Sequence, residues 1–309
     1  MTVKLRKITR EYDLLFILLL LLVIMAAKNP GAFFNSRNIA SILRLSTIVG
    51  IATIGEGLVL LVKDVDLSVG AVMGLVSILT AVILQTSGIL TAVVVSLLIC
   101  AVIGFINGLF IVKGKIPAII TTLGMMWFLR GISGAITSGR LIRITNETFI
   151  SLSSLSLWNI VPYFFIVLLI LGIIAIFTLS KLDIGRHIYA IGGDERAAYY
   201  SGINVSRVKI TVFMIAAVMY GISGLLLSSY IRCGMPFAAE GYEFRAITAA
   251  ALGGIALSGG RGKIWKVIPG ALILTILYNL ITSFAISPYL QGLFEGTILI
   301  GAVYICQRN

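Results

Sequence analysis

Long apolar runs separated by short basic intervals constrain this chain more than any other feature. The run Ile89–Val112, for example, contains no charged residue. About 20 such residues in a helix span the hydrocarbon core of a bilayer, where backbone polar groups must be hydrogen-bonded within the protein. The chain is 59% hydrophobic and only 12% charged, whereas soluble domains carry about 25% charged residues. It cannot cover a water-facing surface, and the sequence predicts an all-α polytopic membrane protein.

The apolar runs predict about ten membrane-spanning helices in a single domain that covers residues 1–309. The expected spans are Leu14–Ala27, Leu43–Val62, Leu67–Leu84, Ile89–Val112, Ala118–Thr137, Ile160–Leu179, Ile210–Tyr230, Arg245–Ser258, Val267–Phe284 and Gly292–Ile305. Most lysines and arginines fall in intervals that the positive-inside rule places in the cytoplasm. Both termini are therefore expected on the cytoplasmic side. Charged and glycine-rich interruptions predict that some spans are broken or half helices.

The N-terminal region leaves a second interpretation open. Basic residues precede the run Leu14–Ala27, a pairing that is also typical of a secretory signal peptide. No convincing small-x-small cleavage site follows, and the chain continues as a polytopic protein. We therefore favour a first span whose N-terminus lies in the cytoplasm.

Several function classes fit this composition poorly. The net charge is +12, but the basic residues lie beside apolar runs, so we expect contact with membrane lipid and no nucleic acid. Cys100, Cys233 and Cys306 lie far apart, and His187 is the only histidine. No metal-ligand spacing, nucleophile motif or paired catalytic carboxylate is visible. We therefore expect no metal, no cofactor and no enzymatic activity.

The longest polar interval is Ile191–Ile203, which lies between two apolar runs and is bracketed by basic residues. Asp194 is a good helix N-cap and Gly202 a good terminator, so a short helix on the cytoplasmic membrane surface is predicted between them. Ala197 and Ala198 would give this helix a smooth face that can fit a groove on a partner. The alternative is an ordinary connecting loop between two spans.

Two acids interrupt the chain between the second and third spans. Asp64 and Asp66 cannot lie cheaply against lipid, so they mark a break, a cavity or a membrane edge. Asp66 is well placed to cap the helix Leu67–Leu84, and with Ser68 and Gly70 it would then form a helix start that lines a central route. The simpler alternative is a plain inner-face turn with a capping aspartate.

The same acids leave a different class of transporter open. Acids at membrane depth are functional candidates, and Glu56, Asp64 and Asp66 could serve an ion-coupled secondary transporter as a proton or sodium relay. Energetics separate the two classes. An ATP-driven importer needs a separate ATPase subunit and continues to work when ion gradients are collapsed.

Glycines interrupt the eighth predicted span. Gly253, Gly254, Gly259 and Gly260 are expected to permit close backbone contact or a broken helix. They do not have the spacing of a phosphate-binding loop. In the fifth span, the embedded Arg130 should face protein or extend toward the membrane surface.

An ordered set of motifs then suggests a family. The set comprises Asp66-Leu67-Ser68-Val69-Gly70, Pro117-Ala118-Ile119-Ile120-Thr121-Thr122-Leu123-Gly124, Arg130-Gly131, Gly185-Arg186, Tyr189-Ala190-Ile191-Gly192-Gly193, Ala197-Ala198 with Gly202, Leu252-Gly253-Gly254 and Gly259-Gly260. From about Val49 to the C-terminus the chain resembles the ribose-type permease family of bacterial ABC importers. It departs from that pattern at Lys63-Asp64 where two glycines are usual, at Asp194 where asparagine is usual, and at Arg245 where an acid is common.

The resemblance implies a transmembrane permease subunit of an ATP-driven importer for a monosaccharide or similar polyol-like ligand, in the bacterial cell (inner) membrane. It implies three partners: a cytoplasmic ATPase subunit, a periplasmic or lipid-anchored sugar-binding protein, and a second copy or homologous permease. The coupling loop would be residues 181–209. The residues expected to dock the ATPase are Asp194, Glu195, Arg196, Ala197, Ala198 and Gly202. Those expected along the translocation path are Asp66, Ser68, Gly70, Gly253 and Gly254.

Overall fold

A computed structural model describes residues 18, 19, 21–23, 30–158, 160–284 and 288–308, and it confirms a helical membrane protein. The described residues contain six helices long and apolar enough to cross a bilayer. They are α3 (Ser36–Leu61), α5 (Ile89–Val112), α6 (Ala118–Thr137), α8 (Tyr163–Lys181), α11 (Val205–Ile231) and the segment Ile264–Ser283, which joins the 3-10 turn η1 (Ile264–Lys266) to α13 (Val267–Ser283).

Four further helices accompany these six segments. They are α2 (Pro30–Phe33), α4 (Val69–Ile83), α12 (Tyr242–Leu252) and α14 (Pro288–Arg308). Most of the predicted first span, Leu14–Ala27, lies outside the described residues. The total of ten spans and the cytoplasmic position of both termini stay predictions.

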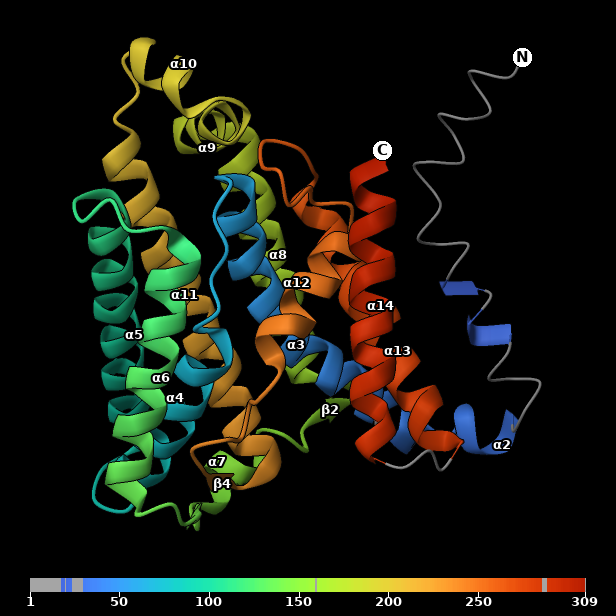
Figure 1. Ribbon diagram of the computed structural model, residues 1–309. Coiled ribbons are helices and arrows are strands. Elements are labelled where there is room, and N and C mark those ends of the chain that lie inside the picture. The colour runs from blue at the N-terminus through green and yellow to red at the C-terminus, as the bar shows by residue number, and fades with distance from the viewer. Residues whose placement is uncertain (1–17, 20, 24–29, 159, 285–287, 309) are drawn as a thin grey trace.

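Helix α3 lies at the centre of the molecule, with α11, α13, α12 and α8 packed around it (Figure 1). In the most apolar stretch of α3, 83% of the residues are buried, against 28% in α5 and 22% in α8. The outer helices expose large apolar side chains such as Leu98, Phe128 and Ile173. Without a bilayer such surfaces would be a severe liability, so they must face lipid or another subunit.

Capping decides where several helices begin and end. Helix α3 begins at Ser36, earlier than the predicted Leu43, because the Asn35 side chain accepts a hydrogen bond from the Arg37 amide at 2.9 Å. Helices α5 and α6 have the predicted bounds. Helix α12 ends at Leu252 rather than at the predicted Ser258, because the glycines after it turn the chain away.

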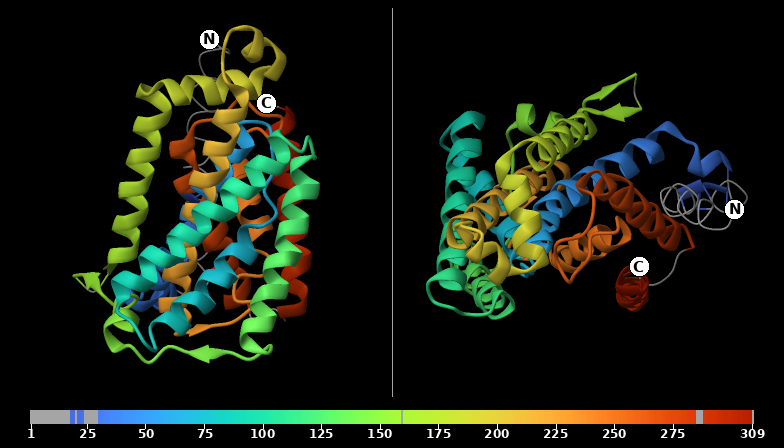
Figure 2. Two further views of the ribbon diagram at one scale, coloured as in Figure 1. Left: turned by 90° about the vertical axis from the view of Figure 1, so that its left-hand side faces the viewer. Right: turned by 90° about the horizontal axis from the view of Figure 1, so that it is seen from above.

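The two ends of the bundle differ in structure. At one end, α9 (Asp183–Gly193) and α10 (Glu195–Tyr200) connect α8 to α11 (Figures 1 and 2). At the other end lie α7 (Glu147–Ser151) and two short antiparallel pairs. Strand β1 (Ile142–Arg143) pairs with β4 (Cys233–Gly234), and β2 (Ser156–Leu157) pairs with β3 (Val161–Pro162).

Candidate functional site: the coupling end and the broken helices

The predicted short helix α10 is present and is capped at its start by Asp194. One carboxylate oxygen of Asp194 accepts hydrogen bonds from the amides of Arg196 at 2.9 Å and Ala197 at 3.0 Å. These two hydrogen bonds hold the pKa of Asp194 below its usual range, and the bond from the Ala197 amide contributes more than the bond from the Arg196 amide. The cap is therefore a carboxylate at neutral pH, which also suits the positive end of the helix dipole.

Gly202 ends α10 as predicted. Its φ of +84° is a left-handed conformation that side chains disfavour. The Gly202 amide donates to the Tyr199 carbonyl at 3.0 Å, and the Ile203 amide donates to the Ala198 carbonyl at 3.1 Å. These bonds satisfy carbonyls that a helix end otherwise leaves unpaired. The preceding helix, α9, ends at Gly193, directly before the Asp194 cap.

The two alanines of α10 face opposite ways, which corrects the prediction that both offer a smooth surface. Ala197 is exposed, but Ala198 is only 4% exposed and packs inside the chain. Tyr199 and Tyr200 instead form an outward aromatic pair, with ring centroids 5.7 Å apart in an edge-to-face arrangement. The surface available to a partner is therefore Ala197 with these two rings and the exposed Arg196.

Lys209 joins α10 to the rest of the molecule. Its ammonium nitrogen lies 2.9 Å from Glu195 Oε2 and 3.1 Å from Asp64 Oδ2. In the sequence Lys209 is one of several basic residues that bracket the loop, and nothing there distinguishes it. Glu195 was expected to dock the ATPase, but here its carboxylate is paired with Lys209 of its own chain.

A pocket of about 780 Å³ opens beside this ion-pair cluster. One wall is the turn between α5 and α6, including Lys115 and Ile116, and the other is formed by Arg196, Tyr199 and Lys209 from α10 and α11. The pocket therefore combines apolar walls with basic groups at the end of the bundle that carries α10.

The break between α3 and α4 is organised by Asp66, but not as the predicted cap. Helix α4 begins at Val69, and Ser68 occupies the cap position. Asp66 Oδ1 accepts hydrogen bonds from the Ser68 amide at 2.8 Å and the Ser68 hydroxyl at 2.6 Å. Asp66 therefore fixes the turn that leads into α4, and both residues are almost completely buried.

A buried polar network surrounds this turn. Glu56 accepts hydrogen bonds from the Asp66 amide at 3.3 Å and from the Tyr220 hydroxyl at 2.9 Å. Asn107 donates to the Ser68 hydroxyl at 3.4 Å, and Thr122 accepts from the Leu67 amide at 3.1 Å. Four helices thus hold one irregular segment, which satisfies the requirement that non-helical backbone at membrane depth be buried in protein.

The start of α4 lies against the start of α12. A Cβ atom at Gly70 would lie 2.3 Å from the Ala239 carbonyl oxygen and 2.4 Å from Glu243 Oε2, so only glycine permits this approach. Glu243 also pairs with Arg130 at 3.4 Å. The Arg130 side chain is only 11% exposed, so the prediction that it faces protein is confirmed.

The glycines after α12 form the predicted break with close backbone contact. Gly254, Gly259 and Gly260 all have positive φ angles. The Gly260 amide donates to the Leu61 carbonyl at the end of α3 at 3.0 Å. A Cβ atom at Gly192 would lie 1.8 Å from that carbonyl oxygen. The loop after α12 that contains Gly254, Gly259 and Gly260, here called the glycine loop, therefore meets α9 and α3 backbone to backbone.

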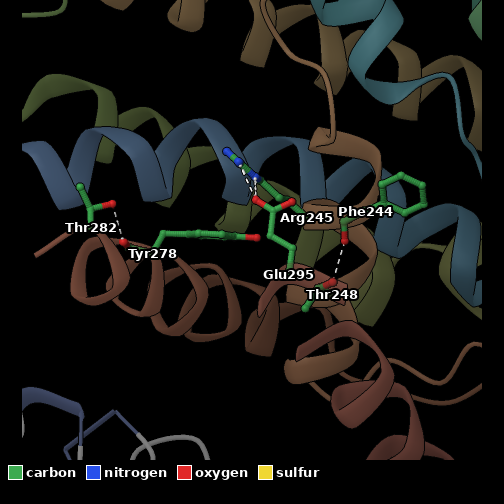
Figure 3. A network of polar contacts seen from close by, with 6 residues as sticks. All are labelled: Phe244, Arg245, Thr248, Tyr278, Thr282 and Glu295. Carbon is green, nitrogen blue, oxygen red and sulfur yellow. Dashed lines mark hydrogen bonds and ion pairs between the residues drawn. The ribbon is translucent and has the colours of Figure 1, made fainter. Parts of the chain in front are cut away.

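Arg245 links α12 to α14 (Figure 3). Its Nη2 and Nε atoms lie 2.7 Å and 3.2 Å from Glu295 Oε1, and its guanidinium lies over the Tyr278 ring at 4.7 Å. Arginine stands here where the resembling family commonly has an acid. In this chain Glu295 supplies the opposite charge, so Arg245 has an ion-pair partner within its own subunit.

The predicted path residues are mostly internal. Asp66, Ser68, Gly70 and Gly253 are buried within this single chain, whereas Gly254 is exposed. They shape the break between α3 and α4 and the break after α12. Their contact with a substrate stays a prediction.

Comparison with known proteins places this fold in a defined class. Residues 38–303 match the family described as branched-chain amino acid transport system / permease component, and the chain belongs to that family. It is therefore a transport permease of the bacterial cell membrane, consistent with the six apolar spans found among its described residues.

Individual relatives narrow the resemblance. The chain is 35% identical over 292 residues to ribose import permease protein RbsC of Haemophilus influenzae, which covers 93% of this chain and 90% of the relative. It is 34% identical over 306 residues to RbsC of Escherichia coli K12, covering 97% and 94%. It is 33% identical over 303 residues to L-arabinose transport system permease protein AraH of E. coli K12, covering 96% and 90%. No solved structure matches the chain.

Proposed function

We propose that this chain is the transmembrane permease subunit of an ATP-driven importer for a monosaccharide or similar small polyol-like ligand. Identity across nearly the whole chain to ribose and L-arabinose permeases supports this substrate class. The permease does not hydrolyse ATP. Its partners are a cytoplasmic ATPase, a periplasmic or lipid-anchored sugar-binding protein, and a second copy or homologous permease.

Helix α10 is the ATPase-docking element in this proposal. The observation that carries it is a capped helix with an exposed face, joined directly to the helices on either side at the bundle end that carries α9. A partner that pushes on such a helix moves α9 and α11 with it. Ala197 sits at the contact, Tyr199 and Tyr200 provide apolar area, and Asp194 and Gly202 fix the helix ends.

The ion-coupled alternative has no support in these comparisons. Its three acids also have internal partners, since Asp64 pairs with Lys209 and both Glu56 and Asp66 accept hydrogen bonds. We therefore do not carry it forward.

Two substitutions on α10 test the docking role. Ala197→Trp and Gly202→Trp add bulk where side-chain space is open, so the permease should still insert in the membrane. Because overpacking an interface costs about 1–3 kcal/mol, we expect ATPase co-purification to fall about tenfold or more, with loss of ATP-driven uptake in vesicles.

Gly139→Trp is the matched control. Gly139 has a φ of +72°, close to the +84° of Gly202, and neither position has a neighbouring atom within 4 Å of an added Cβ. Gly139 follows α6 at the other end of the bundle, so this variant carries the same backbone strain but should keep ATPase binding. Normal assembly and uptake in Ala197→Trp would show that α10 is not the docking element.

A further inference from the structure

The ion-pair cluster of Glu195, Lys209 and Asp64 is mostly shielded from water. The Lys209 and Asp64 side chains are 9% and 12% exposed, whereas Glu195 is 55% exposed. A largely buried cation between two carboxylates is held strongly in place, because removing it would leave uncompensated acids in a poorly solvated site. The cluster is thus a specific connection rather than an incidental surface pair.

Its three members come from three different elements. Glu195 is the first residue of α10, Lys209 lies in the second turn of α11, and Asp64 belongs to the break between α3 and α4. Asp64 is two positions before Asp66, which fixes the turn into α4. The cluster is therefore a short connection from the proposed docking helix to the broken helix in the core.

We infer that Lys209 is a positioning residue that transmits displacement of α10 to the break between α3 and α4. When α10 moves, Glu195 moves with it, and Lys209 carries that movement to Asp64 and the start of α4. This inference rests on the proposed docking of the ATPase at α10. The inference is nevertheless distinct from the docking proposal, because docking involves the outer face of α10 whereas transmission involves its inner face.

The surrounding contacts support transmission through this route. On the neighbouring side, Gly192 of α9 meets the end of α3 backbone to backbone, without room for a side chain. That contact can act as a fixed pivot, whereas the ion pairs of Lys209 connect side chains from three separate elements. Lys115 and Arg196 line the same pocket and bring further positive charge beside the two acids.

The test uses the complete transporter in proteoliposomes, with the ATPase, the binding protein and radiolabelled ribose as the probe. Three quantities are measured: ATPase co-purification, ATP hydrolysis and uptake per ATP. For Lys209→Met we expect normal co-purification but about a tenfold fall in uptake per ATP, equivalent to a lost coupling free energy of about 1.4 kcal/mol. Glu195→Gln, at a half-exposed position, should do the same without affecting folding.

Two controls accompany these variants. Arg207→Met removes an exposed cation two residues before Lys209 and outside the cluster, and should leave uptake per ATP unchanged. Lys209→Arg keeps the charge and should recover most of the coupling. Combining Asp64→Asn with Glu195→Gln should be no worse than the more damaging single substitution, because both act through Lys209.

The outcomes separate this inference from the docking proposal. Unchanged uptake per ATP in both Lys209→Met and Glu195→Gln would overturn transmission. A fall in uptake per ATP in the Asp64→Asn, Glu195→Gln double variant that equals the product of the two single falls would also overturn it. Loss of ATPase co-purification in Lys209→Met, Lys209→Arg and Glu195→Gln alike would also overturn it, since the cluster would then only support docking. Failure of the docking proposal is recognised differently, by normal assembly of Ala197→Trp.

Discussion

Single residues hold the broken segments in place through buried polar atoms. Glu56 is the clearest case, since its two carboxyl oxygens reach the Asp66 amide and the Tyr220 hydroxyl on different elements. A buried group that loses such a partner carries the full cost of its desolvation. The irregular backbone near Asp66 therefore depends on side chains far away in the sequence.

Tyr220→Phe tests this dependence. The substitution preserves the ring but removes the donor to Glu56, so we expect a loss of about 1–3 kcal/mol in the free energy of unfolding. Tyr200→Phe, at a side chain that is 86% exposed, should change stability by less than about 0.5 kcal/mol. Thermal unfolding in detergent micelles measures both, and equal melting temperatures for the two variants would contradict the role given to Tyr220.

Residue-level contacts were only partly predictable from the sequence. Asp194 and Gly202 were identifiable because capping preferences are local. The ion pairs of Lys209 were not, because nothing in a linear pattern says which of several nearby basic residues turns inward. Ala198 was misplaced for the same reason, since its neighbour Ala197 has the same local preference but the opposite exposure.

At the scale of elements, two breaks meet the end of α9. The end of α3 meets Gly192, and the glycine loop after α12 meets both Gly192 and Gly193, in each case through backbone atoms. Small residues allow helices in membranes to approach this closely. The relative position of the three elements is therefore set by the absence of side chains.

Gly260→Ala should disrupt this meeting point more than Gly254→Ala. Both residues have positive φ, +66° and +77°, so both substitutions carry about 1–2 kcal/mol of backbone strain. At Gly260 the new Cβ would also lie 2.6 Å from the Gly193 amide nitrogen, whereas at Gly254 it would meet nothing within 4 Å. Equal unfolding free energies for the two variants would show that the close approach is unimportant.

Elements were predicted well where hydropathy decides them and less well at breaks. The bounds of α5 follow from an uninterrupted apolar run, and the start of α6 follows from Pro117. The starts of α4 and α12 depend on Gly70, Ala239 and Glu243 meeting across the fold. Such tertiary contacts have no local signal, so the sequence indicated that breaks exist but not where their helices begin.

For the whole molecule, orientation follows from the difference between the two ends. The end with α9 and α10 carries Lys181, Arg186, Arg196 and Arg207, and the positive-inside rule predicts that this end lies in the cytoplasm. The end with the short strands would then face outward, where the proposed sugar-binding protein would deliver its ligand. Since α9 and α10 lie at the end opposite α7 and β4 (Figure 1), the proposed function would place ATP hydrolysis and ligand delivery on opposite faces of one bundle.

The most direct test of this account is photo-crosslinking from both ends in intact cells. A benzophenone side chain replaces Tyr200 on α10 or Trp158 in the turn between β2 and β3, two aromatic positions that are 86% and 85% exposed. We expect Tyr200 to crosslink to the ATPase subunit and Trp158 to give no such product. A crosslink to the ATPase from Trp158, or none from Tyr200 in an assembled and active transporter, would contradict the assignment of α10 as the coupling element.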